Sequence, residues 1–154
     1  MSDLPREIRG VMVPVTEGRV LLPNATIAEV ISYTRPEEIA GAPAWLLGRL
    51  PWRGWRLPLV SFPILTGQLQ DENRNNARVA VLKALSGHAS MPFIALLAQG
   101  FPRLTTITPE LLIPTSDEHP HAPGVQAEVL VRDDRAVIPD LEAIEQMVVD
   151  ALAA

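Results

Sequence analysis

The sequence predicts a mainly β protein in which two small barrels share a core, with one short internal helix and one C-terminal helix. Short apolar runs separated by turn residues recur along the chain, which is typical of barrels and sandwiches. A polar run at residues 68–78 divides these runs into two sets of similar size. We therefore expect one domain over residues 1–154, with approximate halves at 8–67 and 79–154.

The composition is that of a folded domain without thiol chemistry. Of 154 residues, 47% are hydrophobic and 20% are charged, and a chain of this length buries roughly two thirds of its unfolded surface. The absence of cysteine excludes thiol nucleophiles, disulfides and thiolate metal sites. The net charge of -5 disfavours nucleic acid as a partner, because phosphate binding needs clustered positive charge. Since neither a signal peptide nor an apolar membrane span is recognisable, we expect a cytoplasmic protein without direct membrane insertion.

The first predicted elements are a hairpin and a short helix. Residues 8–15 and 19–22 are apolar runs on either side of a glycine-containing turn, which predicts two paired strands. Residues 26–29 match a capping box, and apolar residues follow at helical spacing. This pattern predicts the internal helix over residues 26–33.

Residues 45–62 predict a strand, a tight turn and a second strand. Gly54 can adopt the positive φ that such a turn requires. Pro51 and Pro58 lack the N–H that a central strand donates, which predicts edge strands or bulges at these positions. All three tryptophans of the chain lie in this stretch: Trp45, Trp52 and Trp55.

A polar loop and a buried hairpin come next. Residues 68–78 contain one apolar residue larger than alanine, which predicts a solvated loop. Residues 79–85 and 92–97 are almost uninterrupted apolar runs, and runs of this length predict strands that are buried on both faces.

The chain ends with a last hairpin and a helix. Residues 125–138 predict two strands that turn at Asp133 and Asp134. Pro139 and Asp140 are typical of the start of a helix. That helix has one apolar face, which consists of Leu141, Ile144, Val148 and Leu152.

Candidate catalytic and metal-binding residues are few. His119 and His121 lie close together in a proline-rich loop, but a complete set of metal ligands is not recognisable around them. His88 lies in a predicted turn and belongs to no nucleophile motif. Six carboxylates occur as adjacent pairs that we expect to be solvated: Asp71, Glu72, Asp117, Glu118, Asp133 and Asp134. Together these observations predict no enzyme activity, no metal and no cofactor.

A strip rich in arginine and tryptophan is the most distinctive local feature. It consists of Arg49, Trp52, Arg53, Trp55 and Arg56. Such residues are typical of the centre of a protein interface, although aromatic residues between arginines can also stack on single-stranded nucleic acid. For Trp52 and Trp55, the sequence leaves an interface role and a core role equally open. For Trp45, which directly precedes two leucines, it favours a place in the core. The alternative function is therefore a small β-barrel that binds an apolar ligand or single-stranded nucleic acid through this strip.

Residues 48–62 resemble the CheW-like chemotaxis coupling proteins. That family carries a Gly-Val-Ile-Asn-Leu-Arg-Gly segment followed by a strand of the form Pro-Val-Val-Asp-Leu. This chain has Gly-Arg-Leu-Pro-Trp-Arg-Gly and then Pro-Leu-Val-Ser-Phe, with matches at Gly48, Arg53, Gly54 and Pro58. The predicted elements upstream keep the family's order, so the resemblance spans essentially the whole chain.

The resemblance implies two SH3-like five-stranded barrels packed together, with helices at the edges. It also implies a non-catalytic adaptor that binds the regulatory domain of a CheA-type histidine kinase and the cytoplasmic tip of a methyl-accepting chemoreceptor. The receptor tip would dock in the groove between the barrels, and the kinase domain would dock on barrel strands. The implied partner-binding residues are Arg53 and Gly54 of the motif, with Trp52 and Trp55 beside them, and an apolar lining of Leu50, Leu57, Leu59 and Val60.

Three departures from the family pattern remove polar groups. Pro51 and Trp52 replace Asn-Leu before the Arg-Gly turn. Ser61 replaces an aspartate after the second strand, and residues 97–100, Leu-Ala-Gln-Gly, stand where the family normally has a pattern with Val-Asp. These changes imply a divergent, auxiliary coupler, such as one that serves pilus-based twitching motility, rather than the main flagellar coupler.

Overall fold

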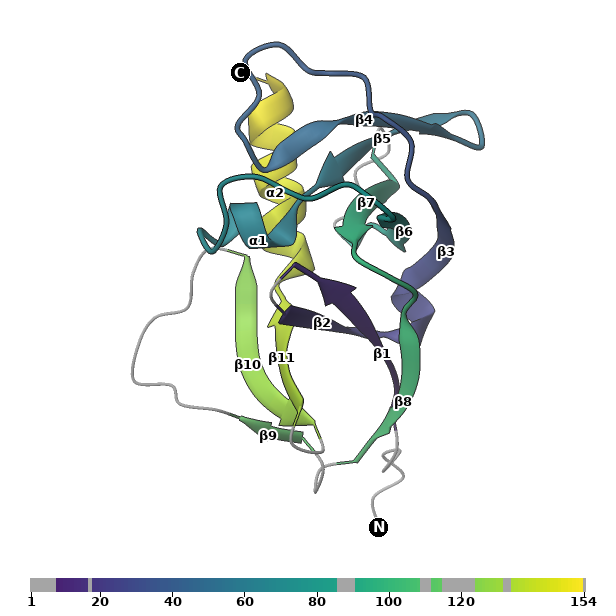
Figure 1. Ribbon diagram of the computed structural model, residues 1–154, viewed down its shortest axis with the longest axis vertical. Helices are drawn as coiled ribbons and strands as arrows, with labels where there is room; N and C mark the ends of the chain where they lie inside the picture. The colour runs from purple at the N-terminus through teal and green to yellow at the C-terminus, as the bar shows by residue number, and fades with distance from the viewer. Residues whose placement is uncertain are drawn as a thin grey trace.

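A computed structural model of the chain describes residues 8–16, 18–85, 91–108, 112–114, 124–131 and 134–153 (Figure 1). Within these residues, eleven strands form two sheets, and two α-helices accompany them. The predicted mainly β fold with a short internal helix and a C-terminal helix is thus confirmed, although the internal helix lies elsewhere in the sequence. None of the helices in these residues is long and apolar enough to cross a membrane.

The first sheet, which we call the first barrel, joins the N-terminal hairpin to the C-terminal strands. Its strands β1 and β2 pair antiparallel, as predicted, and β2 also pairs parallel with β11 through Val20 and Val137. The predicted last hairpin is β10 and β11, whose connecting residues 132–133 lie outside the described part of the chain. A short sixth strand extends the five that the resemblance implies. In spatial order the strands are β8 (Arg103–Ile107), β1 (Ile8–Val15), β2 (Gly18–Pro23), β11 (Asp134–Pro139), β10 (Val125–Val131) and β9 (Leu112–Pro114).

The second sheet, or second barrel, has the five strands expected. The predicted buried hairpin is β6 and β7, which lie at its centre, and its connecting residues 86–90 are outside the described residues. Each sheet takes strands from both halves of the sequence, so the two barrels do not correspond to residues 8–67 and 79–154. In spatial order the strands are β3 (Ile27–Ser32), β6 (Arg78–Lys83), β7 (Phe93–Ala98), β5 (Trp55–Val60) and β4 (Leu46–Trp52).

The prediction of a helix over residues 26–33 is wrong. Asn24–Thr26 form one 3-10 turn, η1, and the chain then continues as β3. The apolar residues at helical spacing are Ile27, Val30 and Ile31, which are β-branched and therefore also suited to a strand. Pairing with the buried strand β6 selects the extended form, because it satisfies the backbone groups of both strands.

The internal helix is instead α1, Phe62–Leu65, which directly follows β5. Ser61 caps it, since its Oγ accepts a hydrogen bond from the backbone N–H of Ile64 at 3.3 Å. Proline at position 63 suits the first turn of a helix, where its missing N–H has no intrahelical partner to lose.

Alternation along the strands divides the core into three parts. On β1, Val11, Val13 and Val15 face a core that is shared between the two barrels, whereas Met12 points into the first barrel. On β6, Ala80 and Leu82 face the shared core, and the alternate residues point into the second barrel. Because β1 and β6 are buried on both faces, they are almost entirely apolar.

The C-terminal helix α2, Leu141–Ala153, is confirmed where it was predicted. Asp140 caps it by accepting the N–H of Ala143 on Oδ1 at 3.1 Å. Its apolar face, with Leu141, Ile144 and Val148, packs into the shared core. Figure 1 shows the helix running alongside both barrels, which places one rigid element across the seam between them.

The polar segment 68–77 is not simply solvated, because Glu72 is buried with only 8% of its surface exposed. Its Oε1 accepts the hydroxyl of Thr16 and its Oε2 accepts the hydroxyl of Ser61, each at 2.6 Å. Gln99 donates from Nε2 to Oε1 at 3.4 Å and to the backbone oxygen of Asn73 at 2.8 Å. Thr16, Ser61 and Gln99 directly follow β1, β5 and β7, so one carboxylate ties together the ends of three strands.

Candidate protein-binding surface

The strands β4 and β5 form the predicted hairpin around Arg53 and Gly54. Trp52 pairs with Trp55, which leaves a two-residue loop. Both loop residues have positive φ, 48° at Arg53 and 82° at Gly54, as in the type I′ turns that match the twist of antiparallel strands. The sequence predicted this conformation for the glycine only. Arg53 adopts it as well, which is uncommon for a residue with a side chain.

The two prolines of the hairpin suit their places in the sheet. Pro51 lies in β4, which is an edge strand as predicted. Pro58 lies in β5, which has neighbours on both sides, but its pairing with β7 begins only at Leu59. Neither proline therefore interrupts a continuous ladder.

A carboxylate from the far edge of the second barrel receives the tip of this hairpin. Arg53 donates from Nε and Nη2 to Oε1 of Glu29, at 3.1 and 2.9 Å, and Trp52 donates from Nε1 to the same oxygen at 3.0 Å. The guanidinium of Arg53 also lies 5.2 Å from the centre of the Trp52 ring. Since Glu29 is on β3 and Trp52 on β4, the two edge strands of the sheet, these bonds help to close it into a barrel. The hydrogen bonds from Arg53 and then Trp52 lower the pKa of Glu29 below its ordinary value of 4.5.

The segment after β3 completes the closure. The backbone groups of Glu37 and Arg49 exchange two hydrogen bonds, at 2.8 and 2.9 Å. This approach requires glycine at position 48, because a Cβ there would lie 2.5 Å from the carbonyl oxygen of Glu37 and the φ is 145°. On the exposed surface, Nη1 of Arg56 lies 3.4 Å from Oε1 of Glu37.

The structure divides the predicted site residues into two groups. The four apolar residues expected to line an interface are buried at 1% exposure or less and pack in the cores: Leu50, Leu57, Leu59 and Val60. Arg53 and Gly54 are exposed, and Trp55 is 40% exposed. Trp52 is half-buried, with its ring 4.9 Å from that of Phe93 at an angle of 67°. Trp45 packs against the shared core, the role that its sequence context favoured.

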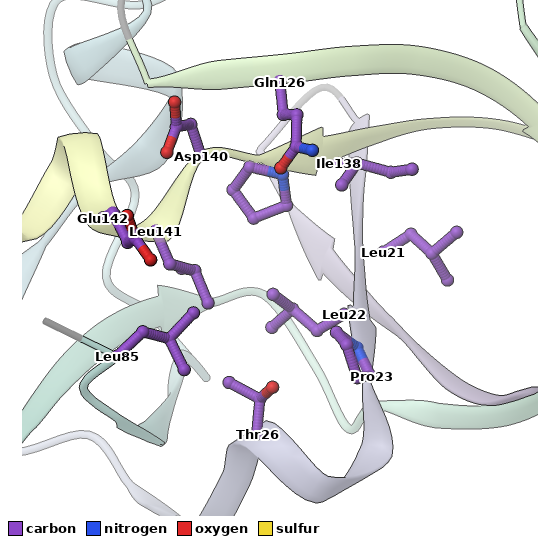
Figure 2. A pocket seen from close by; sticks show the side chains of 11 residues that line it. Leu21, Leu22, Pro23, Thr26, Leu85, Gln126, Ile138, Asp140, Leu141 and Glu142 are labelled. Carbon is purple, nitrogen blue, oxygen red and sulfur yellow. The ribbon is translucent and has the colours of Figure 1, made fainter.

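A groove between the barrels is the second candidate surface. It encloses about 480 Å³ where β2, the end of β11 and the start of α2 meet. Figure 2 shows Leu22 of β2, Leu141 of α2 and Leu85, which follows β6, converging on it, with Asp140 and Glu142 at one side. Leu85 is 54% exposed, so the groove offers apolar surface to a partner. The resemblance implied such a groove, but its residues come from widely separated segments and could not be named from the sequence.

Three further observations concern residues outside these surfaces. Phe101 and Leu104, at the beginning of the β8 region, are 65% and 71% exposed, and no sequence motif singled them out. The described residues contain no cluster of three or more side chains suited to a metal ion. All three histidines lie outside the part of the chain that the structure describes.

Two barrels with a shared core, an exposed hairpin tip and an apolar groove define a protein-binding scaffold. A sequence model of the CheW-like domain matches residues 9–148, so the chain belongs to the CheW-like family of non-catalytic chemotaxis adaptors. Its structure is similar to that of the scaffolding protein TtCheW from Thermoanaerobacter tengcongensis, with a TM-score of 0.72 and 15% sequence identity. The match covers 92% of this chain and 89% of TtCheW, which shows a shared fold. A comparison with curated proteins found no match.

Proposed function

We propose that this protein couples methyl-accepting chemoreceptors to a CheA-type histidine kinase. The observation that carries the proposal is the presence of two separate candidate surfaces on one double barrel, the hairpin tip and the groove. A coupling protein needs to hold two partners at the same time, and a shared core with a helix along both barrels keeps the two surfaces in a fixed relation.

The groove suits the cytoplasmic tip of a receptor. Receptor tips of this class are helical hairpins, and an amphipathic helix binds by placing its apolar face in a hydrophobic groove. Leu85, at 54% exposure, offers an apolar side chain to the partner, and Leu22 and Leu141 line the groove at 1% and 8% exposure.

The hairpin tip suits the regulatory domain of the kinase. Arg53 and Trp55 project from a tight turn that two partners, Glu29 and the Trp52 ring, hold in place. Rigid, exposed Arg and Trp side chains are the residue types that contribute most to protein interfaces, because little conformational entropy is lost on binding.

The protein would act in the cytoplasm, at receptor arrays to which its partners recruit it. The departures from the family pattern at Ser61 and at residues 97–100 support a divergent, auxiliary coupler, for example one in a twitching-motility system. In these two segments, Ser61 and Gln99 both donate hydrogen bonds to Glu72.

Binding of purified partners tests the proposal. Titration calorimetry with the kinase regulatory domain should show that Arg53→Ala and Trp55→Ala each weaken binding by about 10-fold or more. Arg103→Ala is the matched control, because Arg103 is an exposed arginine on β8 of the first barrel. Binding of the receptor tip should be lost instead with Leu85→Asp. Failure of the unaltered protein to bind either partner with micromolar affinity would refute the coupling function.

A further inference from the structure

We infer that the open end of the second barrel docks an acidic segment of a partner protein in which a carboxylate lies beside an apolar side chain. This barrel mouth consists of Trp52, Arg53, Trp55, Lys83 and Phe93. The inference rests on the proposed function and deepens it, since it names the chemistry by which the kinase domain would be recognised.

Strand register places these residues at one end of one barrel. Lys83 pairs with Phe93 across β6 and β7, and Trp52 pairs with Trp55 across β4 and β5. The parallel pairing of Leu59 with Ala95 puts the start of β5 at the same end as the start of β7. Alternation then puts Lys83 on the same face as Val79 and Val81, which point into the barrel.

The mouth has an aromatic floor that remains open to solvent. Leu57 and Leu59, on the same face of β5 as Trp55, are 1% and 0% exposed. Trp55 continues this face outward and is 40% exposed, while Trp52 and Phe93 meet edge to face below it. The interior of the barrel therefore ends in an apolar surface that is partly exposed to solvent.

Positive charge predominates around this floor. The mouth carries two cations, Arg53 and Lys83. Arg53 is paired with Glu29, whose Oε1 also accepts a hydrogen bond from Trp52. Lys83 is the only lysine of the chain, it is exposed, and it forms no ion pair with any of the described residues. In a protein with a net charge of -5, a local excess of positive charge beside exposed aromatic surface is complementary to an acidic, partly apolar partner segment.

A protein segment fits this surface better than single-stranded nucleic acid. Nucleic acids need a track of several cations along the phosphate backbone and flat aromatic faces for base stacking. The barrel mouth offers two cations, and the ring of Trp52 stands at 67° to that of Phe93 rather than parallel to it.

The test uses the full chain and the kinase regulatory domain at low and high salt. At low salt, Lys83→Glu should weaken binding by about 10-fold, and the loss should shrink at high salt because the interaction is electrostatic. Lys83→Arg should bind within about 2-fold of the unaltered protein. Arg103→Glu makes the same change of charge on the first barrel and should also stay within about 2-fold. Thermal unfolding of each variant establishes that the fold is intact.

The outcomes separate the inference from the function on which it rests. Equal effects of Lys83→Glu and Arg103→Glu, or a loss that does not depend on salt, would overturn the inference, while weakening by Arg53→Ala would leave the coupling function in place. No binding by the unaltered protein would overturn both. If a poly-thymidine oligonucleotide binds in a salt-dependent way and Lys83→Glu abolishes this binding, the occupant of the barrel mouth is single-stranded nucleic acid and the inference is overturned.

Discussion

Glu29 and Glu72 both join strands of this protein, but they do so in opposite surroundings. Glu29 lies at the surface, with 37% of its side chain exposed, and binds the guanidinium of Arg53 and the indole of Trp52. Glu72 is 8% exposed and accepts two hydroxyl groups and an amide. The first carboxylate closes one barrel beside the candidate interface, and the second ties strands of both barrels together.

The difference shows where each carboxylate matters. An exposed ion pair contributes little to folding, because water and salt compete with it. A buried carboxylate leaves its donors without partners when it is removed, and this loss is expensive. We therefore expect substitutions around Glu72 to affect stability and substitutions around Glu29 to affect recognition.

The largest effect should come from Glu72→Ala. Removal of the carboxylate leaves the buried hydroxyl of Ser61 and the half-buried hydroxyl of Thr16 without their acceptor, and we expect the free energy of unfolding to fall by about 3 kcal/mol. Chemical denaturation measures this change. The control is Gln70→Ala, an exposed position in the same polar segment, which should change stability by less than about 0.5 kcal/mol. Similar values for the two variants would show that Glu72 is not a stabilising link.

A smaller loss should follow from Ser61→Ala. This substitution removes one of the two hydroxyl donors of Glu72 and also the cap of α1, so we expect a loss of about 1 to 2 kcal/mol. Ser32→Ala is the comparison, since Ser32 is exposed and accepts a bond from Arg78 only at the surface. An unchanged denaturation midpoint for Ser61→Ala would contradict the role assigned to this serine.

Arg53→Ala should hardly alter stability, with a Tm within about 2 °C of the unaltered protein. It should nevertheless raise the pKa of Glu29 towards 4.5, because the hydrogen bond from Arg53 is the main cause of the lowered value. An NMR titration of the Glu29 carboxyl group measures this shift directly. A pKa that stays low in the variant would assign the shift to Trp52 instead.

The smallest effect is the dependence of stability on pH through Glu29. Its pKa is lower in the folded than in the unfolded protein, so its contribution is present above the unfolded value and is lost as the pH falls through the folded value. The difference in Tm between the unaltered protein and Glu29→Gln should therefore shrink as the pH falls below about 4.5. In the Arg53→Ala background this pH dependence should be much weaker.

Local patterns allowed much of the fold to be predicted from the sequence. The apolar runs of β6 and β7, the turn at Gly54 and the spacing along α2 each depend on residues that are neighbours in the chain. The helix predicted over residues 26–33 failed for the same reason, since β-branched residues allow both forms and the choice depended on the distant strand β6. Part of the candidate site could be predicted, because the motif located Arg53 and Gly54. The sequence could not distinguish the exposed Trp55 from the interior Leu57, since their exposure depends on how the barrel is assembled.

The sequence by itself determined the elements whose signals are local: the type of most strands, the C-terminal helix, the Arg-Gly turn and the resemblance to a family. The tertiary structure alone decided how strands from both halves of the sequence combine into each barrel. It also decided which carboxylates join strands through hydrogen bonds. Glu29 and Arg53 are 24 residues apart, and Glu72 and Thr16 are 56 residues apart. Contacts over such separations form only when the sheets are assembled, because backbone pairing and burial of apolar faces bring the side chains together and exclude the water that would otherwise bind them.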